Sequence, residues 1–450
     1  MTMKSQAFPL ILPVFLFCWL LSAWTPLLAQ EKPAPNELDY LFPFCYSLSR
    51  EDYQGLPSGF TSAYKSASAR LTPLLDRPQT AQLEKVIEQL TKARELAGKN
   101  LQARALAANR LALAYFALSK AQRRTEPLRR AEDTLQNALT DARGEELPRT
   151  YHNLGFIHLD LAYKTEMTRH LKLALENLNR AAQDPKWRKN RLDYGKTQYL
   201  LGTLYSQLYH LENPVENLKK SIAHFKTAME IFKACQTKTP GDDLKYSIGY
   251  AYGMLFMLGK NPEDFEKSIS YYDNVLKLMK TQEKLPASYA ETLEALGNIY
   301  VSASEVKNPE KNLNKAIYCL EKARQICDAK NQPEVYTQIY WDLGFAYYHL
   351  AEVKRPRENL EKALSLYRQA LKDRDLEKEF TYDYVEYLFN LGSAYSALYQ
   401  FDGREENRAA ALKWLNRALA LAKKHGYDHD IAPITEAIDQ LQEKGGHDER

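Results

Sequence analysis

Small and apolar residues recur along most of this chain at fixed intervals. A leucine or isoleucine followed by glycine occurs six times, with a tyrosine or histidine three residues after each glycine. These glycines are Gly155, Gly202, Gly249, Gly297, Gly344 and Gly392, and their successive spacings are 47, 47, 48, 47 and 48. A seventh copy, Leu111-Ala112 with Tyr115, has alanine in place of glycine. A constant period of this length predicts a repeat architecture, with the glycines as its structural anchors.

A second segment of each copy carries a small, a large apolar and another small residue. They stand at positions +19, +23 and +26 relative to the glycine position. The first small residues are Ala131, Ala174, Ser221, Ser268, Ala316, Ala363 and Ala411. Spacings of four and seven residues share one helical face, and small residues let neighbouring backbones approach. The pattern predicts two helices per copy that pack through this face.

Polar residues and prolines indicate where these helices begin. Asparagine or aspartate stands four residues before the small residue in five copies, where we expect helix N-caps: Asn217, Asp264, Asn312, Asn359 and Asn407. Prolines just ahead of them mark the turn between paired helices: Pro214, Pro262, Pro309 and Pro356. Pro286 and Pro333 fit the first turn of a copy's opening helix.

Together these features resemble the tetratricopeptide repeat in a long-period form seen in bacterial proteins. The resemblance covers residues 101–425 and is clearest in LGFAYYHLAEVKRPRENLEKALSLYRQAL at 343–371. The usual unit has about 34 residues, whereas the period of most of these copies is 47 or 48. The resemblance implies an all-α fold, a right-handed superhelical α-solenoid of stacked antiparallel helix pairs.

The chain divides into five predicted parts. Residues 1–29 resemble a signal peptide, because Lys4 is their only charge and residues 8–24 are an apolar run. The other parts are an irregular linker at 30–59, a degenerate first repeat at 60–100, seven repeats at 101–425, and a capping helix with a tail at 426–450. We expect an exported chain, periplasmic or extracellular, cleaved near Ala29. An uncleaved segment anchoring it in the inner membrane is the alternative.

The charge balance and motifs narrow the function classes. The chain has 61 Lys and Arg against 57 Asp and Glu, without a basic block that would favour nucleic-acid binding. It lacks the GxSxG, GxxxxGK and HExxH motifs. We therefore predict that it is not an enzyme and has no cofactor.

Histidines and cysteines receive structural interpretations. His152 and His158 are six residues apart, on different faces of a helix, and each is interpreted as structural. The polar group of His425, Asp428, His429 and Asp430 is interpreted as a helix end, so no metal site is predicted. The expected mature chain has Cys45, Cys235, Cys319 and Cys327, which we expect to be small buried side chains, with their disulfide state open.

One face of each first helix is a candidate for partner binding. Positions −3, +1 and +4 relative to the glycine contain no lysine or arginine, which disfavours binding of acidic tails. The candidate residues are Tyr199, Tyr246, Tyr250, Trp341, Phe345, Tyr348 and Phe389. Burial of these aromatics in a wide packing face is the alternative.

The resemblance implies a non-catalytic scaffold or adaptor of the cell envelope that binds a peptide or protein segment in a concave groove. The alternative hypothesis is a periplasmic or surface receptor for a ligand, which requires a closed pocket. The oligomeric state stays open.

Overall fold

The computed structural model describes Tyr53 and residues 55–236, 241–280, 287–327, 333–372 and 381–445. The predicted signal peptide, most of the linker and the end of the tail lie outside these residues. The described residues form eighteen helices and no strand. The chain falls into two compact units, and the boundary between Ala251 and Tyr252 lies within α12 (Gly241–Gly259).

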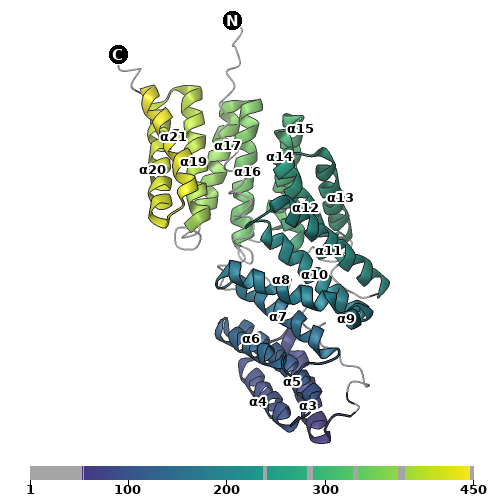
Figure 1. Cartoon of the computed structure of the whole chain (residues 1–450). Coiled ribbons are helices and arrows are strands. Elements are labelled where there is room, and N and C mark those ends of the chain that lie inside the picture. The colour runs from purple at the N-terminus through teal and green to yellow at the C-terminus, as the bar shows by residue number, and fades with distance from the viewer. Residues whose placement is uncertain are drawn as a thin grey trace. The chain divides into compact units, whose positions relative to one another are not determined.

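The N-terminal unit, described here up to Ala251, is a row of helix pairs (Figure 1). Its helices are α3 (Ser58–Asp76), α4 (Thr80–Leu96), α5 (Leu101–Gln122), α6 (Glu126–Ala138), α7 (Glu146–Ala162), α8 (Met167–Gln183), the short α9 (Pro185–Lys189), α10 (Arg191–Leu208) and α11 (Pro214–Ala234). Helices α3 and α4 pack together ahead of the first glycine-type copy.

The C-terminal unit, from Tyr252, repeats the same pairing. Its helices after α12 are α13 (Pro262–Met279), α14 (Ala287–Ser304), α15 (Pro309–Ile326), α16 (Pro333–Val353), α17 (Pro356–Lys372), α19 (Thr381–Asp402), α20 (Glu405–His425) and α21 (Asp428–Gly445). Helix α21 packs on α20. The predicted all-α fold of stacked helix pairs is confirmed.

The anchor glycines lie where two helices of a pair approach most closely. A Cβ atom added at Gly344 would lie 2.5 Å from Cε1 of Tyr367, and one at Gly202 would lie 2.5 Å from Cδ1 of Phe225. Gly155, Gly297 and Gly392 meet Leu178, Leu320 and Leu415 at 2.5–2.7 Å in the same way. Since real Cβ atoms do not approach so closely, glycine is required by the large side chain at position +23 of the same copy.

The turn inside each copy repeats with the same backbone geometry. The residue at position +11 relative to the glycine or Ala112 has a positive φ, between 40° and 66°, in all seven copies. These residues are Arg123, Glu166, Asn213, Lys260, Asn308, Arg355 and Gly403. Only the last is a glycine, so six turns hold a left-handed residue that has a side chain.

The N-cap prediction is wrong. Asn217 lies inside α11, which begins at Pro214, and its Nδ2 donates to the Glu212 carbonyl oxygen at 2.6 Å. Asn312 and Asn359 donate in the same way to the carbonyls of Lys307 and Lys354, at 2.6 and 2.7 Å. The second helices start a turn earlier than expected, and these amides hold the turn to the helix instead of capping it.

Cys235 and Cys319 are free cysteines. Cys319 and Cys327 are buried, as expected, whereas Cys235 is partly exposed; Cys45 lies outside the described residues. Among the described helices, none is both long enough and apolar enough to cross a membrane.

Replacing an anchor glycine should loosen its pair. We expect Gly344→Ala to lower the free energy of unfolding by about 1–3 kcal/mol, because the new methyl group collides with the Tyr367 ring. Chemical denaturation checks this, with Gly59→Ala as the control because a Cβ at Gly59 meets no atom within 4 Å. Equal stability losses for both variants would contradict the packing argument.

Candidate partner-binding face

The first helices of successive pairs touch one another within each unit. Helix α5 lies against α3 and α7, and α7 against α10, in the N-terminal unit. Helix α16 lies against α14 and α19 in the C-terminal unit. We call these rows the first-helix face of each unit.

Buried polar side chains join α5 to α7. Asn109 Nδ2 lies 3.2 Å from Glu146 Oε2 and 3.1 Å from Thr150 Oγ1, and Asn153 Nδ2 donates to Asn109 Oδ1 at 2.6 Å. Glu146 also pairs with Arg149. All five side chains are buried, so these groups serve the contact between repeats.

A buried carboxylate adds an ion pair between the same helices. Asp160 on α7 is contacted by Lys120 Nζ at 2.9 Å and by Lys164 Nζ at 2.8 Å. Burial disfavours its ionisation, but the charges of Lys120 and Lys164 outweigh burial and hold the Asp160 pKa below its usual value. The carboxylate therefore stays ionised at neutral pH.

His152 takes part in the next polar contact. Its Nδ1 lies 2.8 Å from Thr197 Oγ1 on α10, which also accepts a hydrogen bond from Trp187 Nε1 at 2.8 Å. Burial, followed by the charges of Lys196 and Arg149, lowers the pKa of His152 to about 3. It is a neutral, hydrogen-bonded side chain.

A hydrogen-bond chain crosses three first helices in the C-terminal unit. Asn298 Nδ2 donates to Glu294 Oε1 at 2.7 Å and to Asp342 Oδ2 at 3.0 Å, so it links α14 to α16. Gln338 Nε2 donates to Asp342 Oδ1 at 2.9 Å, and Tyr387 on α19 donates its hydroxyl to Gln338 Oε1 at 3.0 Å. Burial and the Asp342 carboxylate raise the pKa of Glu294 well above its usual range. Glu294 is therefore protonated over a wider pH range than an ordinary glutamate.

The structure separates the aromatic candidates by burial. Trp341 is 1% exposed, and its ring lies 4.2 Å from that of Tyr367 and 4.0 Å from that of Tyr387, measured between centroids. This packing supports the alternative that Trp341 is a core residue. Tyr199, Tyr250 and Phe389 are also buried.

The remaining candidates are partly exposed. These are Tyr246, Phe345 and Tyr348. Phe345 and Tyr348 lie together on α16, and their rings contact the His349 ring at centroid distances of 4.4 and 5.4 Å. Partner binding by these aromatics stays a prediction.

The sequence interpretation missed the polar network beneath the aromatic positions. Asp342 stands two residues and Gln338 six residues before the same glycine, outside the three positions considered. The sequence does contain a pattern that indicates such contacts. Position −6 has a charged or amide side chain in six of the seven copies, one of which is Gln338. Polar residues recurring at one helical position next to an apolar face indicate contacts between neighbouring helices.

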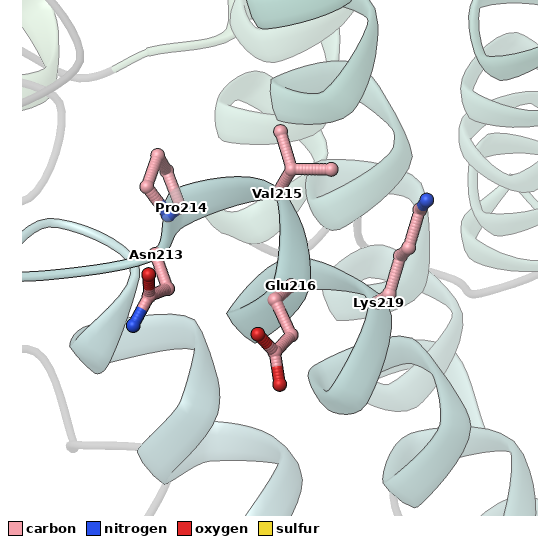
Figure 2. A pocket seen from close by; sticks show the side chains of 5 residues that line it. All are labelled: Asn213, Pro214, Val215, Glu216 and Lys219. Carbon is pink, nitrogen blue, oxygen red and sulfur yellow. The ribbon is translucent and has the colours of Figure 1, made fainter.

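A surface hollow of about 400 Å³ lies at the start of α11 (Figure 2). It is lined by Asn213, Pro214, Val215, Glu216 and Lys219. All but Pro214 are exposed, and Figure 2 shows Glu216 and Lys219 pointing apart. This hollow lacks the converging polar groups of a small-molecule site.

Comparison with known proteins supports the fold. No protein-family model matches the sequence, and no curated protein matches it. The crystal structure of the apo form of RapI has a TM-score of 0.50 and 13% identity, and the match covers 86% of this chain and 97% of RapI.

Two other solved structures give lower scores. A Rap protein complexed with competence and sporulation factor has a TM-score of 0.46 and 12% identity, over 86% of this chain and 96% of that one. The apo quorum sensor NprR from B. thuringiensis has a TM-score of 0.45 and 13% identity, over 85% and 99%. The likeness to RapI, at 13% identity, shows a shared fold, a helical solenoid of the tetratricopeptide-like type.

The raised pKa of Glu294 predicts a change in pH dependence. A carboxyl group whose pKa is higher in the folded chain than the ordinary glutamate value of 4.5 stabilises the fold below pH 4.5, and this contribution is lost as the pH rises through the pKa of the folded state. We expect the melting temperature of Glu294→Gln to fall less than that of the unmodified chain between about pH 5 and about pH 8. Glu443→Gln, at an exposed position, is the control. If the melting temperatures of Glu294→Gln and of the unmodified chain fall by the same amount over this pH range, the raised pKa of Glu294 is refuted.

Proposed function

We propose that this chain is a non-catalytic interaction protein that binds a peptide or protein segment along its first-helix face. One observation carries the proposal. The polar groups described on this face of the C-terminal unit bind one another across successive helices, whereas Phe345 and Tyr348 keep part of their surface accessible. A partner would therefore contact aromatic side chains, while the polar side chains of the same helices are hydrogen-bonded to one another.

The part of the face on α16 is the proposed anchor for an apolar partner residue. Phe345 and Tyr348 are three residues apart and share the His349 ring as a neighbour. Aromatic side chains give large contact area with little loss of conformational freedom. Asp342 on the same helix is hydrogen-bonded through Asn298 to Glu294 on α14, and the raised pKa of Glu294 favours its uncharged form.

An open face is favoured over a closed ligand pocket. The hollow beside α11 is formed by mostly exposed side chains at the start of a second helix, outside the first-helix face. A receptor for a small molecule encloses most of its ligand. This hollow therefore gives no support to the receptor interpretation.

We further propose that the chain acts in the cell envelope after export. The apolar residues 8–24 and the single charge at Lys4 support this location. Sequencing the N-terminus of the mature protein tests it, and cleavage near Ala29 is the expected result. Full-length protein in the membrane fraction would support the anchored alternative, and full-length cytoplasmic protein would refute export.

Substituting the two partly exposed aromatics of α16, Phe345 and Tyr348, should weaken partner binding without unfolding the chain. Peptides selected from a displayed random library on the purified chain are titrated into Phe345→Ala/Tyr348→Ala. We expect a binding loss of about 2 kcal/mol or more, as for aromatic anchors in interfaces.

The matched control is Tyr318→Ala/Phe401→Ala, which removes two aromatics that are 60% and 52% exposed on α15 and α19. Melting curves show whether each variant is folded. Selected peptides that bind both variants equally well would place binding elsewhere and refute the proposed anchor.

A further inference from the structure

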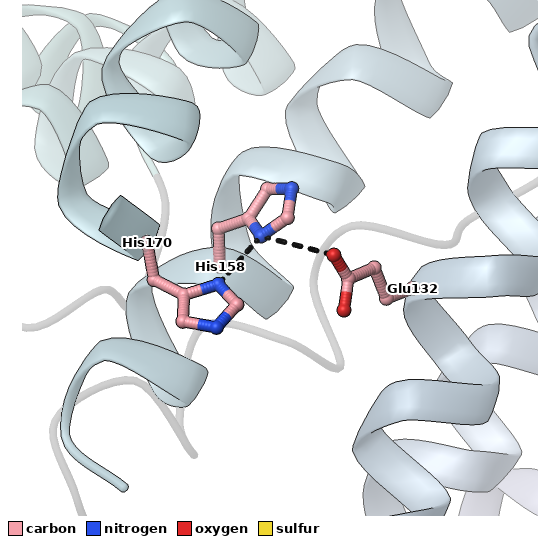
Figure 3. Close-up of side chains that lie close together, drawn as sticks. All are labelled: Glu132, His158 and His170. Carbon is pink, nitrogen blue, oxygen red and sulfur yellow. Dashed lines mark hydrogen bonds and ion pairs between the residues drawn. The ribbon is translucent and has the colours of Figure 1, made fainter. Parts of the chain in front are cut away.

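Three potential metal ligands from three consecutive helices meet in the N-terminal unit. Figure 3 shows Glu132 on α6, His158 on α7 and His170 on α8 pointing toward one another. The two Nδ1 atoms are 3.2 Å apart, and His158 Nδ1 is 3.8 Å from Glu132 Oε1. One ligand atom from each residue lies within 4.8 Å of the other two. Both histidines are buried.

All three residues depart from what the other repeats have at the same position. The position of His158, +3 relative to the glycine, is tyrosine in the six other copies. The position of His170, +15, is asparagine or aspartate in five copies and proline in one. The position of Glu132, +20, is isoleucine or leucine in the six others. The repeat fold therefore requires none of these side chains, yet they occur together.

A fourth position changes with them. Lysine stands at position +18 in four copies, and each lies over the tyrosine of its own copy: Lys220, Lys267, Lys315 and Lys362. The copy with the histidine pair has Leu173 instead. An ammonium group beside the two imidazoles would repel a bound cation, and this copy lacks it.

The spacing suits a tetrahedral metal ion. With bonds of about 2.0–2.1 Å to nitrogen, two ligand nitrogens on one zinc ion lie about 3.3 Å apart. The separation of the two Nδ1 atoms, 3.2 Å, is close to this value. The Glu132 carboxylate is 3.8 Å from His158 Nδ1 and within 4.8 Å of a His170 ring nitrogen, so it has to move closer to both; its side chain is 25% exposed, which leaves it room to rotate.

We propose that Glu132, His158 and His170 bind one divalent transition-metal ion, with zinc as the ion that best fits two imidazoles and a carboxylate. The set has no thiolate, which separates it from the cysteine-rich structural zinc sites. Three protein ligands leave a fourth position for water on the side that Glu132 exposes to solvent.

The protonation states of the two histidines agree with this assignment, whereas burial raises the pKa of Glu132, so metal binding has to displace its proton where it is protonated. Burial, followed by the charges of His170 and Arg169, lowers the pKa of His158 to about 4, and burial also lowers that of His170. Neutral imidazoles offer the lone pairs that a metal needs. Around Glu132 stand Asp133, Glu166, Arg129 and Arg169. The Arg169 guanidinium is 2.9 Å from a Glu166 carboxylate oxygen, which offsets its charge.

The ion would join two repeats. Helix α6 ends the first glycine-type copy and α7 and α8 form the next, so the three ligands cross the contact between copies. A metal ion that binds the folded chain but not the unfolded chain stabilises the fold by mass action. This inference does not depend on the proposed binding of a peptide.

The repeats themselves supply variants designed to fold. His158→Tyr, His170→Asn and Glu132→Leu each restore the residue type found at that position in other copies. The purified full chain is freed of metal with a chelator and titrated with Zn²⁺ by calorimetry. Titration with Co²⁺ reports tetrahedral coordination by its visible absorption. We expect one ion per chain and a higher melting temperature with Zn²⁺.

Each ligand variant should bind Zn²⁺ more than about 10-fold more weakly than the unmodified chain. Even substitutions of residues that only hydrogen-bond to a metal ligand lower metal affinity by about this factor. His425→Ala/His429→Ala, at the other histidine group, is the control and should bind as the unmodified chain does. No Zn²⁺ binding by the unmodified chain would overturn the proposal. So would undiminished binding in folded His158→Tyr and His170→Asn, or loss of binding in the control variant alone.

Discussion

The closest contact inside each helix pair fixes the distance on which the other packing depends. At Gly344 and Gly202 the backbone of the first helix touches an aromatic ring of the second, with no room for a methyl group. The glycine contact sets the spacing within a pair, and successive pairs then meet through their first helices, where Asn298 reaches Asp342.

The fold was predictable because each column of the repeat corresponds to one contact. The glycine column and the column of large apolar residues at position +23 are partners in space, so their pairing in sequence reported the packing directly. The residues at which the second helices begin were harder to predict from the sequence. An asparagine near a helix start has the composition of a cap, and only the backbone shows that Asn217 lies within the helix and donates to the Glu212 carbonyl.

The candidate site was predictable only in part. Helical spacing placed Trp341, Phe345 and Tyr348 on one side of α16, but it could not show that Tyr367 and Tyr387 enclose the Trp341 ring. Burial of this kind depends on side chains from other helices. The histidines illustrate the same limit, because a turn between α7 and α8 brings His158 to His170, whereas comparison within one helix considered His152.

The left-handed residue in each turn determines where the chain tolerates a change in length. The offset from the glycine position to the first small residue of the second helix is the same in all seven copies, whereas the spacing between successive copies varies. One inserted residue in the turn would rotate the second helix by about 100° and direct its small residues away from the glycine. The differences in length between copies therefore lie after the first small residue of the second helix, and grafted segments belong there as well.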